Sequence, residues 1–496
     1  MGARQAAFFS RVKIASSFCI VTSLGLTALL AGCANVPAPE LDRSVPAAWI
    51  EQGGRAPAPG GDDVTPQNAQ RAAQLTAADL QTWWKRWKDP ELDALVDRAL
   101  AQNLDLAQAM GRLRQQRRLM GVAEASFQPE VSGGVRTLQD VAAVDSYFHA
   151  SIDVTWDLGL FGAREATRAA ARGELLSAEA QWRGARINLV ADTVRRYLDI
   201  RIAQHQRVLL RERIGLEQRA VRLSEVRLAQ QIDGADAVHQ ARMQLQQSRG
   251  QLIDITEQQR RAAHALAVLL GQPSPDPAWL SESADARLPD PQHFELQVLP
   301  ADLLRTRPDI ETAEAAVQRA AGTLGLSRSA LYPRFQLTGS LLYSYNLTRN
   351  RRTTFDQMPL IGPAIDIPLF DWSRRRSQAD ADEAALQVAV AAYRQSILEG
   401  IADVEGALTG LNAQRERMAA LREAEALIQA RDGQLARRQQ LGLSSDHARL
   451  AEQRARLSNL ADQNVARGAQ ALSYVALFKA LGGAPLPAES GEGAMP

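Results

Sequence analysis

The segment YFHASIDVTWDL, residues Tyr147–Leu158, alternates apolar and polar side chains without a break. A period of two is typical of a β-strand that has one apolar and one polar face. The segment RFQLTGSLLYSYN, Arg334–Asn346, has the same period, with Leu342 as its exception. Weaker strands are predicted at Val131–Val135 and at Ile361–Ile367. The sequence therefore predicts four strands.

Strands of about ten residues with an apolar outer face, a polar inner face and aromatic residues near their ends are typical of transmembrane β-barrels. On this hypothesis the predicted lipid-facing side chains are Phe148, Ile152, Val154, Trp156, Phe335, Leu337, Leu341 and Tyr343. The alternative is an amphipathic sheet that packs against a helix of the same chain.

Four strands cannot close on themselves, and an open sheet edge in lipid leaves backbone groups unsatisfied at several kcal/mol each. A barrel therefore requires further copies of the chain. Two copies would give eight strands with a filled interior, whereas three would give twelve and leave room for a pore. We expect an oligomer, and a conducting role favours three or more copies.

The rest of the chain is predicted to be mainly α-helical, with the β part small. No proline occurs between Pro129 and Pro273 or between Pro368 and Pro485, so nothing there obliges a helix to end. A helix from about Arg164 to Gln230 would be ~100 Å long. An earlier helix is predicted to begin with Asp89 as its cap and to end near Asn103. Coiled-coil spacing of three and four residues occurs at Ile187, Val190, Val194 and Tyr197, and again at Ile397, Ile401, Val404, Leu408 and Leu411.

The chain is internally duplicated. Asp105–Pro129 aligns without a gap with Asp309–Pro333, and Asp157–Phe161 aligns with Asp366–Phe370. A collinear series of matches predicts two copies of one structural unit. Each unit is expected to hold a helix, two β-strands and a long helical hairpin, with the repeats at residues 81–273 and 302–484 and a connector at 274–301.

The N-terminus is predicted to be a processing signal. A basic start is followed by the apolar stretch Ile14–Leu30, which is short for a transmembrane helix, and then by Leu-Ala-Gly-Cys ending at Cys33. This ending resembles a bacterial lipobox, which implies removal of residues 1–32 and a covalent lipid on Cys33. The alternative is an ordinary signal with a chance cysteine. Ala34 follows the cysteine, and by the lipoprotein sorting rule it favours the outer membrane.

Two further segments are predicted to be flexible. Residues 33–80 are rich in Pro, Ala and Gly, as in Pro57–Gly61, and are expected to form a lipid-anchored tether. Residues 485–496 are expected to form a tail.

Several function classes are excluded by the sequence. Lys and Arg number 57 against 56 Asp and Glu, so the net charge of +1 gives no basic excess of the kind that binds nucleic acid. The six histidines form no His-x-x-x-His pair and no Cys-x-x-Cys occurs, which makes a metal site a weak hypothesis. No phosphate-binding loop or nucleophile elbow is found either. We expect no enzyme activity and no cofactor other than the lipid, so energy for transport would come from a partner.

Several motifs together resemble the TolC-type outer-membrane factor family, in its lipoprotein branch of the NodT kind. They are WWKRWKDPEL at Trp83–Leu92, LLRTRPDI at Leu303–Ile310, ALYP at Ala330–Pro333 and the lipobox. The resemblance extends from about Ala78 to Gly483. It implies a homotrimer whose twelve-stranded barrel in the outer membrane continues into a helical tunnel across the periplasm.

The resemblance also implies partners. Members of the family are exit ducts of tripartite pumps, in which a periplasmic adaptor and an inner-membrane transporter, commonly of the resistance-nodulation-division class, dock to the tunnel's end. Their substrates are drugs, metals or small organic molecules. Two other functions stay open, namely a structural, lipid-anchored coiled-coil protein of the periplasm and an exit duct for type I protein secretion.

In the family the tunnel mouth lies at a Gly-Leu-x-Ser turn followed by a Leu-Asp-Val-like triplet. The second repeat matches the turn with Gly442, Leu443 and Ser445, and the first repeat turns near Gly234 and Asp236. The family's aspartates are absent from the second repeat, because Ala448 and Ala451 stand at their positions. Asp446, and with less support Glu452, are candidates for a substitute ring of carboxylates. The alternative is that both are solvated residues favoured at a helix start by the helix dipole.

Overall fold

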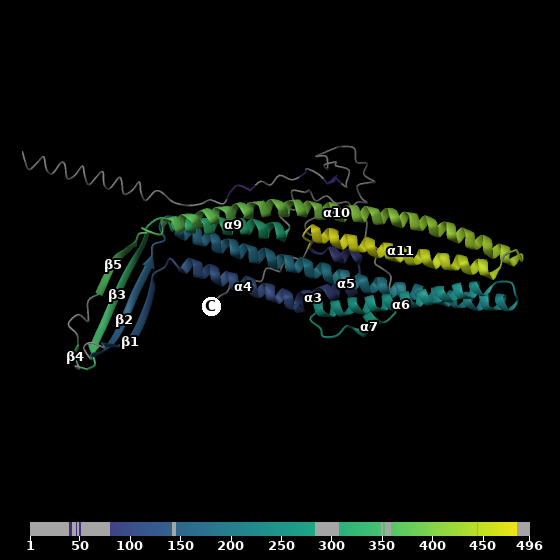
Figure 1. The fold of residues 1–496 in the computed structure, drawn as a ribbon, viewed down its shortest axis with the longest axis horizontal. Coiled ribbons are helices and arrows are strands. Elements are labelled where there is room, and N and C mark those ends of the chain that lie inside the picture. Colours follow the sequence, from purple (N-terminus) through teal and green to yellow (C-terminus); the bar gives the residue numbers. More distant parts are fainter. Residues whose placement is uncertain are drawn as a thin grey trace, which may run out of the picture. The chain divides into compact units, whose positions relative to one another are not determined.

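The computed structural model describes residues 39–41, 46, 49–50, 80–140, 145–282, 307–348, 351–352, 359–443 and 445–483 (Figure 1). Their elements fall into two compact units. The first unit contains residues 112–179 and 312–395, together with the N-terminal residues up to 42. The second unit contains residues 43–111, 180–311 and 396–496. The longest helices contribute residues to both units.

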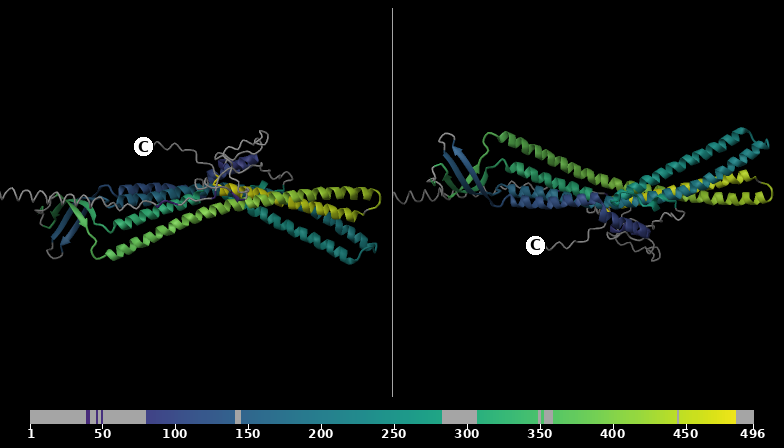
Figure 2. Two further views of the ribbon diagram at one scale, coloured as in Figure 1. Left: turned by 90° about the horizontal axis from the view of Figure 1, so that it is seen from above. Right: turned by 90° about the horizontal axis from the view of Figure 1, so that it is seen from below.

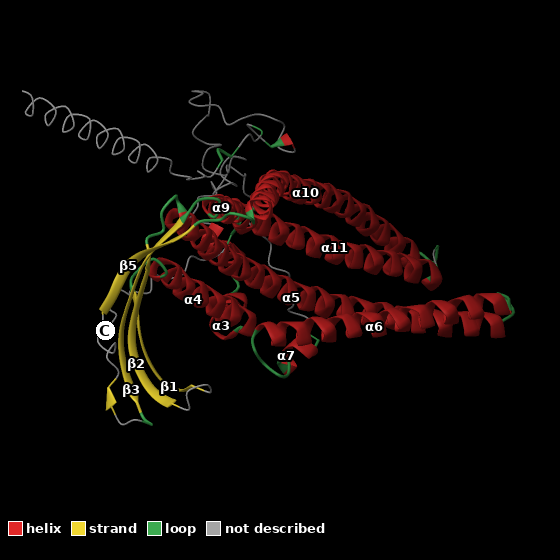
Figure 3. Cartoon of the chain, turned by 60° about the vertical axis from the view of Figure 1, so that its left-hand side comes forward, coloured by secondary structure: helices red, strands yellow, loops and turns green. Residues whose placement is uncertain are grey.

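The first unit contains one antiparallel sheet, whose strands lie side by side (Figures 1 and 3). The strands follow the order β1-β2-β3-β4, and β5 also pairs with β3. Their bounds are β1 Glu130–Asp140, β2 Asp145–Asp157, β3 Arg334–Asn346, β4 Arg351–Arg352 and β5 Pro359–Asp366. The four predicted strands are confirmed as β1, β2, β3 and β5, and the two-residue β4 is an addition.

The register of the sheet brings apolar residues opposite one another. Ile152 of β2 lies opposite Leu341 of β3, and Val154 lies opposite Gly339. The outer strands continue the second row on both sides, because Val131 of β1 lies opposite Val154 and Ile361 of β5 lies opposite Gly339. Residues directly opposite each other share one face of a sheet. The strands therefore form one continuous apolar face and one mainly polar face, which also carries Leu138, Leu342 and Leu360.

Six helices of more than 20 residues account for most of the described chain (Figure 2). The predicted helix from Arg164 to Gln230 is confirmed as α5, which has 67 residues. Their bounds are α4 Leu104–Ala125, α5 Ala163–Ala229, α6 Ala235–Leu269, α9 Pro308–Ser329, α10 Trp372–Gln440 and α11 Asp446–Ala480. Within the described residues, no helix is both long and apolar enough to cross a membrane.

The start of the short helix α3, Pro90–Gln102, follows from its sequence. The Asp89 carboxylate accepts hydrogen bonds from the backbone N–H groups of Glu91, at 3.0 Å, and Leu92, at 3.3 Å. Pro90 takes the first helical position, where its missing N–H costs nothing. The predicted cap and the predicted end at Asn103 are both confirmed.

The core of the second unit joins the predicted seams of the long helices to a tryptophan-rich turn, η2 Trp83–Trp87. Trp83 stacks on Phe478 of α11 with 4.9 Å between ring centroids, and its indole N–H donates to the carbonyl of Gly483 at 3.2 Å. The seam residues that are fully or nearly fully buried here include Val190, Val194, Tyr197, Val404, Leu408 and Leu411. Sequence periodicity therefore identified the core side of these helices.

Candidate functional site

The predicted lipid-facing residues all lie on β2 and β3, on the apolar face of the sheet. Alternate residues along a strand share a face, and the register aligns the two strands. Ile152 and Leu341, which lie opposite each other, are 51% and 48% exposed. The outer strands continue this exposed surface with Val131, Val135, Ile361 and Ile365. A large exposed apolar surface marks a place where a partner or lipid covers the protein.

The opposite face of the sheet is held together by hydrogen bonds between polar side chains. The Asp153 carboxylate accepts from the hydroxyls of Ser151, at 2.8 Å, and Ser340, at 2.6 Å. Nearer the helices, Arg334 forms a 2.6 Å ion pair with Asp157. This face therefore carries hydroxyl and charged groups that favour contact with water.

The first helical hairpin turns between α5 and α6, and an ion pair fixes its end. The Arg227 guanidinium donates twice to the Asp233 carboxylate, at 2.6 and 3.0 Å. These hydrogen bonds hold the pKa of Asp233 below its ordinary value. Gly234 is the N-cap of α6, and Asp236 lies in the first turn of that helix, where the helix dipole favours a carboxylate.

The second hairpin turns between α10 and α11 as its sequence predicts. Gly442 has a φ of 74°, which glycine adopts at little cost, and Leu443 is exposed. The Ser445 hydroxyl accepts a 3.4 Å hydrogen bond from the Ala448 N–H and so caps the start of α11. The carboxylate of Asp446, the first residue of α11, accepts from the Gln439 amide.

The two candidate ring carboxylates stand in different surroundings. The Glu452 side chain is 8% exposed and forms a 3.2 Å ion pair with Arg431 across the hairpin. A second pair of the same kind, between Glu425 and Arg456 at 3.2 Å, lies further along the same two helices. Glu452 thus stabilises the α10–α11 hairpin, whereas the turn itself carries Asp446.

A hydrogen bond also joins the two hairpins. Arg454 of α11 donates to the side-chain oxygen of Gln244 of α6 at 3.0 Å. Closer to the core, the Asn464 amide donates to the side chain of Gln206, at 3.0 Å, and to the carbonyl of Ile202, at 3.1 Å. These contacts link each hairpin to its neighbour within one chain.

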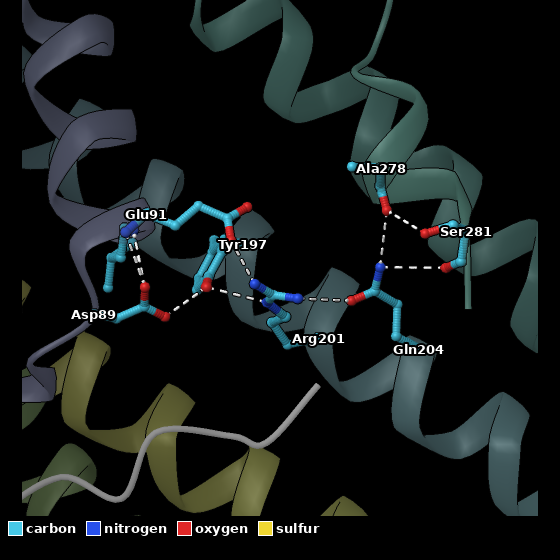
Figure 4. A network of polar contacts seen from close by, with 8 residues as sticks. Asp89, Glu91, Tyr197, Arg201, Gln204, Ala278 and Ser281 are labelled. Carbon is cyan, nitrogen blue, oxygen red and sulfur yellow. Dashed lines mark hydrogen bonds and ion pairs between the residues drawn. The ribbon is translucent and has the colours of Figure 1, made fainter. Parts of the chain in front are cut away.

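A polar network that sequence reasoning missed surrounds Tyr197 (Figure 4). The Tyr197 hydroxyl donates to the second oxygen of Asp89 at 2.5 Å and accepts from Arg201 at 3.0 Å. Arg201 also reaches Glu91 at 2.5 Å. Burial, followed by the bond to Asp89, raises the pKa of Tyr197. The seam spacing predicted a buried Tyr197, but nothing in the spacing indicates that its hydroxyl meets a helix cap far away in the sequence.

The network continues to the small helix α7, Pro277–Leu280, which lies in the predicted connector. The Gln204 amide donates to the carbonyls of Ala278 and Ser281, both at 3.2 Å (Figure 4). Trp279 of α7 is buried in the core of the second unit. Trp49, in the segment predicted to be a tether, is also buried in that core.

Clusters of metal-ligating side chains are absent from the part of the chain that the structure describes. No three His, Cys, Asp or Glu side chains there gather in a way that could hold a metal ion. Cys33 with its lipobox and the predicted tail from residue 485 lie outside the described residues.

The sequence matches one protein-family model over two long segments. The model describes the outer membrane efflux protein family, and it matches residues 95–272 and 299–483. The chain belongs to the outer membrane efflux protein family. As an outer membrane efflux protein it belongs to a family of channels and not of enzymes.

Curated relatives of this efflux protein are similar over most of their length. The pyoverdine export outer membrane protein OpmQ of Pseudomonas aeruginosa is 28% identical over 402 residues, which cover 77% of this chain and 80% of the relative. The toluene efflux pump outer membrane protein TtgF of Pseudomonas putida is 28% identical over 475 residues, covering 93% of this chain and 96% of the relative.

A solved structure shares the fold. The CmeC outer membrane channel of Campylobacter jejuni superposes with a TM-score of 0.76 at 19% identity, covering 91% of this chain and 95% of that one. The mainly helical chain with a small sheet thus has the fold of TolC-like outer membrane channels, as the sequence motifs predicted.

The LLRTRPDI motif contributes a buried cation, Arg307, to the second unit. The Arg307 guanidinium, 9% exposed, pairs with Asp309 at 2.6 Å and with Asp403 of α10 at 2.8 Å, and donates to the carbonyl of Ala480 at 3.0 Å. Pro308 takes the first position of α9 directly after it. The motif therefore joins the start of one helix to two others in the second unit of this efflux protein.

Proposed function

We propose that this outer membrane efflux protein is the exit channel of a tripartite pump and that three copies form one conduit. The observation that carries the proposal is the two-faced sheet with open edges. In the described part of the chain, β1 pairs only with β2, and β5 leaves its outer edge unpaired. Three copies would supply twelve principal strands, enough for a water-filled barrel.

The faces of the sheet support this arrangement. In a barrel, the exposed apolar face with Ile152 and Leu341 meets lipid, and the face with Asp153 and Ser340 lines water. The predicted lipid-facing residues keep this role in the proposal. An exposed apolar sheet has no role in a structural coiled-coil protein of the periplasm. The family is also one of efflux channels.

Partners supply what the chain itself lacks. The sequence carries no nucleotide-binding loop, so passage through the channel is passive and the energy comes from an inner-membrane transporter. We assign that transporter to the resistance-nodulation-division class, joined to this channel by a periplasmic adaptor. The relatives named for pyoverdine export and toluene efflux favour small molecules, whether drugs, metals or organic compounds, over secreted proteins.

The hairpin ends are the proposed tunnel mouth. Gly234 with Asp236 in the first hairpin, and Gly442, Leu443, Ser445 and Asp446 in the second, form the two turns. Asp446 stands on the turn, so three copies would bring three carboxylates to one level. We infer that Asp446 provides the acidic constriction, because Glu452 is already paired within its own hairpin.

The lipid anchor on Cys33 is a separate proposal that rests on the lipobox. Replacement Cys33→Ser is expected to abolish incorporation of labelled palmitate and to leave the signal unprocessed. Unchanged processing and labelling would reject the anchor without touching the channel. The two repeats, residues 81–273 and 302–484, are likewise proposed as copies of one unit, supported by the same order of helix, two strands and helical hairpin in each.

Reconstitution of the full-length protein in a planar lipid bilayer tests the proposed function. We expect discrete conductance steps from the purified oligomer and none from protein dissociated by heat. In cells, deletion of the gene is expected to raise accumulation of the pump's substrates, and expression of the intact protein to reverse it. Absence of conductance together with unchanged accumulation would overturn the proposal.

A further inference from the structure

Aromatic side chains mark both ends of the apolar face of the sheet. At the end away from the helices, Phe148 of β2 lies opposite Tyr345 of β3. At the helix end, the indole N–H of Trp156 donates to the carbonyl of Phe127, between α4 and β1, at 3.0 Å. The step from Phe148 to Trp156 is ~27 Å at ~3.4 Å per residue, close to the ~25 Å apolar band of a transmembrane barrel. In the proposed channel, the Trp156 level therefore lies at the periplasmic surface of the membrane.

Helix α10 begins just beyond that level. Pro363 of β5 lies in the row of Trp156, and β5 ends at Asp366. The chain then passes into α10 at the end of the sheet that joins the helices (Figure 1). Phe370 is fully exposed, and Trp372, the first residue of α10, is 46% exposed. Exposed aromatic residues at this level are typical of side chains that lie among lipid headgroups.

Helix α10 opens with a run of three arginines, Arg374–Arg376, and its first turn holds no acidic residue. Cations at a helix N-terminus oppose the helix dipole, so this run destabilises the helix that carries it. The Asp371 carboxylate accepts from Arg374 and from Arg375, both at 2.8 Å. One carboxylate thus serves two guanidinium groups, and the cluster keeps an excess of positive charge.

Arg376 is the member of the run without a partner. It is exposed, and within the described chain it forms no ion pair or hydrogen bond, not even with Asp380 four residues further on. Residues four apart lie on one side of a helix, so Arg376 shares its side with Trp372. Arg374 is paired with Asp371 and, being two residues away, does not face Arg376. The exposed indole and the unpaired guanidinium therefore form one small surface.

A single exposed arginine is usually solvated and needs no ligand. Arg376 differs in its surroundings, because its run opposes the dipole of its own helix and its side of α10 carries Trp372 at the level of the lipid headgroups. A guanidinium binds phosphate through two parallel hydrogen bonds. Basic clusters at a membrane surface also attract anionic lipids. The chemistry of this surface thus fits a lipid phosphate.

We propose that Trp372 and Arg376 of each copy bind the headgroup of an anionic phospholipid in the inner leaflet of the outer membrane. The Arg376 guanidinium donates to the phosphate, and the Trp372 indole lies at the boundary between headgroup and acyl chains. The excess positive charge around Asp371 selects a headgroup with net negative charge, such as phosphatidylglycerol, over a zwitterionic one. This inference rests on the proposed function, which puts the sheet in the membrane, and adds a lipid ligand to it.

Thermal unfolding of the full-length protein in detergent with added lipid tests the proposal. We expect phosphatidylglycerol to raise the midpoint of the parent protein by several degrees more than phosphatidylcholine does. Arg376→Gln is expected to lose this difference. Arg374→Gln is the matched control, because that arginine is already paired, and we expect it to keep the difference. An equal response of the parent to both lipids, or an unchanged difference in Arg376→Gln, would overturn the proposal.

Two further measurements sharpen the result. Inorganic phosphate at the same concentration is expected to leave the midpoint unchanged, and a shift as large as that with phosphatidylglycerol would show a site for soluble anions instead. Native mass spectrometry of the trimer released from nanodiscs of mixed lipids counts the bound lipids directly. We expect up to three phosphatidylglycerol molecules on the parent, fewer on Arg376→Lys, which keeps the charge but loses the paired hydrogen bonds, and none on Arg376→Gln. Equal retention by all three proteins would reject the site.

Conductance separates this inference from the proposed function. If heat-sensitive trimers conduct but show no preference for phosphatidylglycerol, the inference fails and the channel stands. If Arg376→Gln does not assemble, the comparison of Arg376→Lys with the parent decides, and equal lipid retention by these two overturns the role of the guanidinium. If the parent itself is monomeric and does not conduct, the proposed function fails as well.

Discussion

Arg307 donates a 2.8 Å hydrogen bond to Asp403, and this contact joins the start of α9 to the middle of α10. The guanidinium also pairs with Asp309 and donates to a backbone carbonyl at the end of α11, Ala480. Burial of Arg307 opposes its charge, but the two carboxylates outweigh burial and raise its pKa. One buried cation thus connects three helices of the second unit.

Removing this cation is expected to destabilise the protein. Replacement Arg307→Met keeps the side-chain length and loses the hydrogen bonds to charged groups, so we expect a loss of about 3 kcal/mol in the free energy of unfolding. Arg319→Met is the matched control, because its 3.0 Å pair with Glu174 is exposed on both sides and worth at most about 1 kcal/mol. Thermal unfolding in detergent measures both. Equal shifts of the two midpoints would contradict the role given to Arg307.

A charge on the apolar face of the sheet is expected to block insertion. Arginine at the bilayer midplane on a lipid-facing position costs about 2–4 kcal/mol. We therefore expect Ile152→Arg to reduce assembled, heat-sensitive trimer in the membrane fraction. Thr155→Arg adds the same side chain to the opposite face and is expected to assemble normally. The lipid-facing assignment is wrong if the two variants assemble equally well.

Acid is expected to loosen the first hairpin end. Because Arg227 lowers the pKa of Asp233 in the folded protein, the stabilisation is fully present above the unfolded value of about 3.9. It is lost as the pH falls through the lower pKa of the folded state. The protection factors of the backbone amides in the turn between α5 and α6, taken relative to the intrinsic exchange rate at each pH, should therefore be high near neutral pH and fall in acid. In Asp233→Asn we expect low protection factors with no such acid dependence, and an unchanged acid response in that variant would reject the ion pair as its cause.

The proposed constriction has a measurable electrical signature. Three carboxylates at one level attract cations, so Asp446→Asn is expected to shift the reversal potential under a salt gradient towards lower cation preference. Glu452→Gln is the control, because the Glu452 carboxylate forms an ion pair with Arg431 within its hairpin. We expect that variant to keep the selectivity of the parent. A shift in Glu452→Gln without one in Asp446→Asn would exchange the two assignments.

Local rules predicted much of this fold. The two-residue period predicted the strands that carry Ile152 and Leu341. The absence of proline predicted helices as long as α5, and Asp89 predicted the start of α3. Each of these signals lies in residues that are close together in the sequence, where the local residues determine the backbone conformation.

The contacts between distant segments could not be predicted in this way. Tyr197 meets Asp89 and Glu452 meets Arg431 because packed helices bring them together. Trp49 is one apolar residue in a stretch rich in proline and glycine, and its burial depends on apolar side chains of other helices in the same core. Periodicity predicts which side of a helix is buried but not the partner that buries it.

The central claim is that the polar face of the sheet lines one conduit shared by three copies. The test records the conductance of single Ser340→Cys channels in a planar bilayer while a positively charged methanethiosulfonate reagent is added. Leu341→Cys, on the opposite face, is the control. We predict three equal downward steps of conductance for Ser340→Cys and none for Leu341→Cys. Steps in Leu341→Cys with none in Ser340→Cys, or a single step in either, would contradict the account.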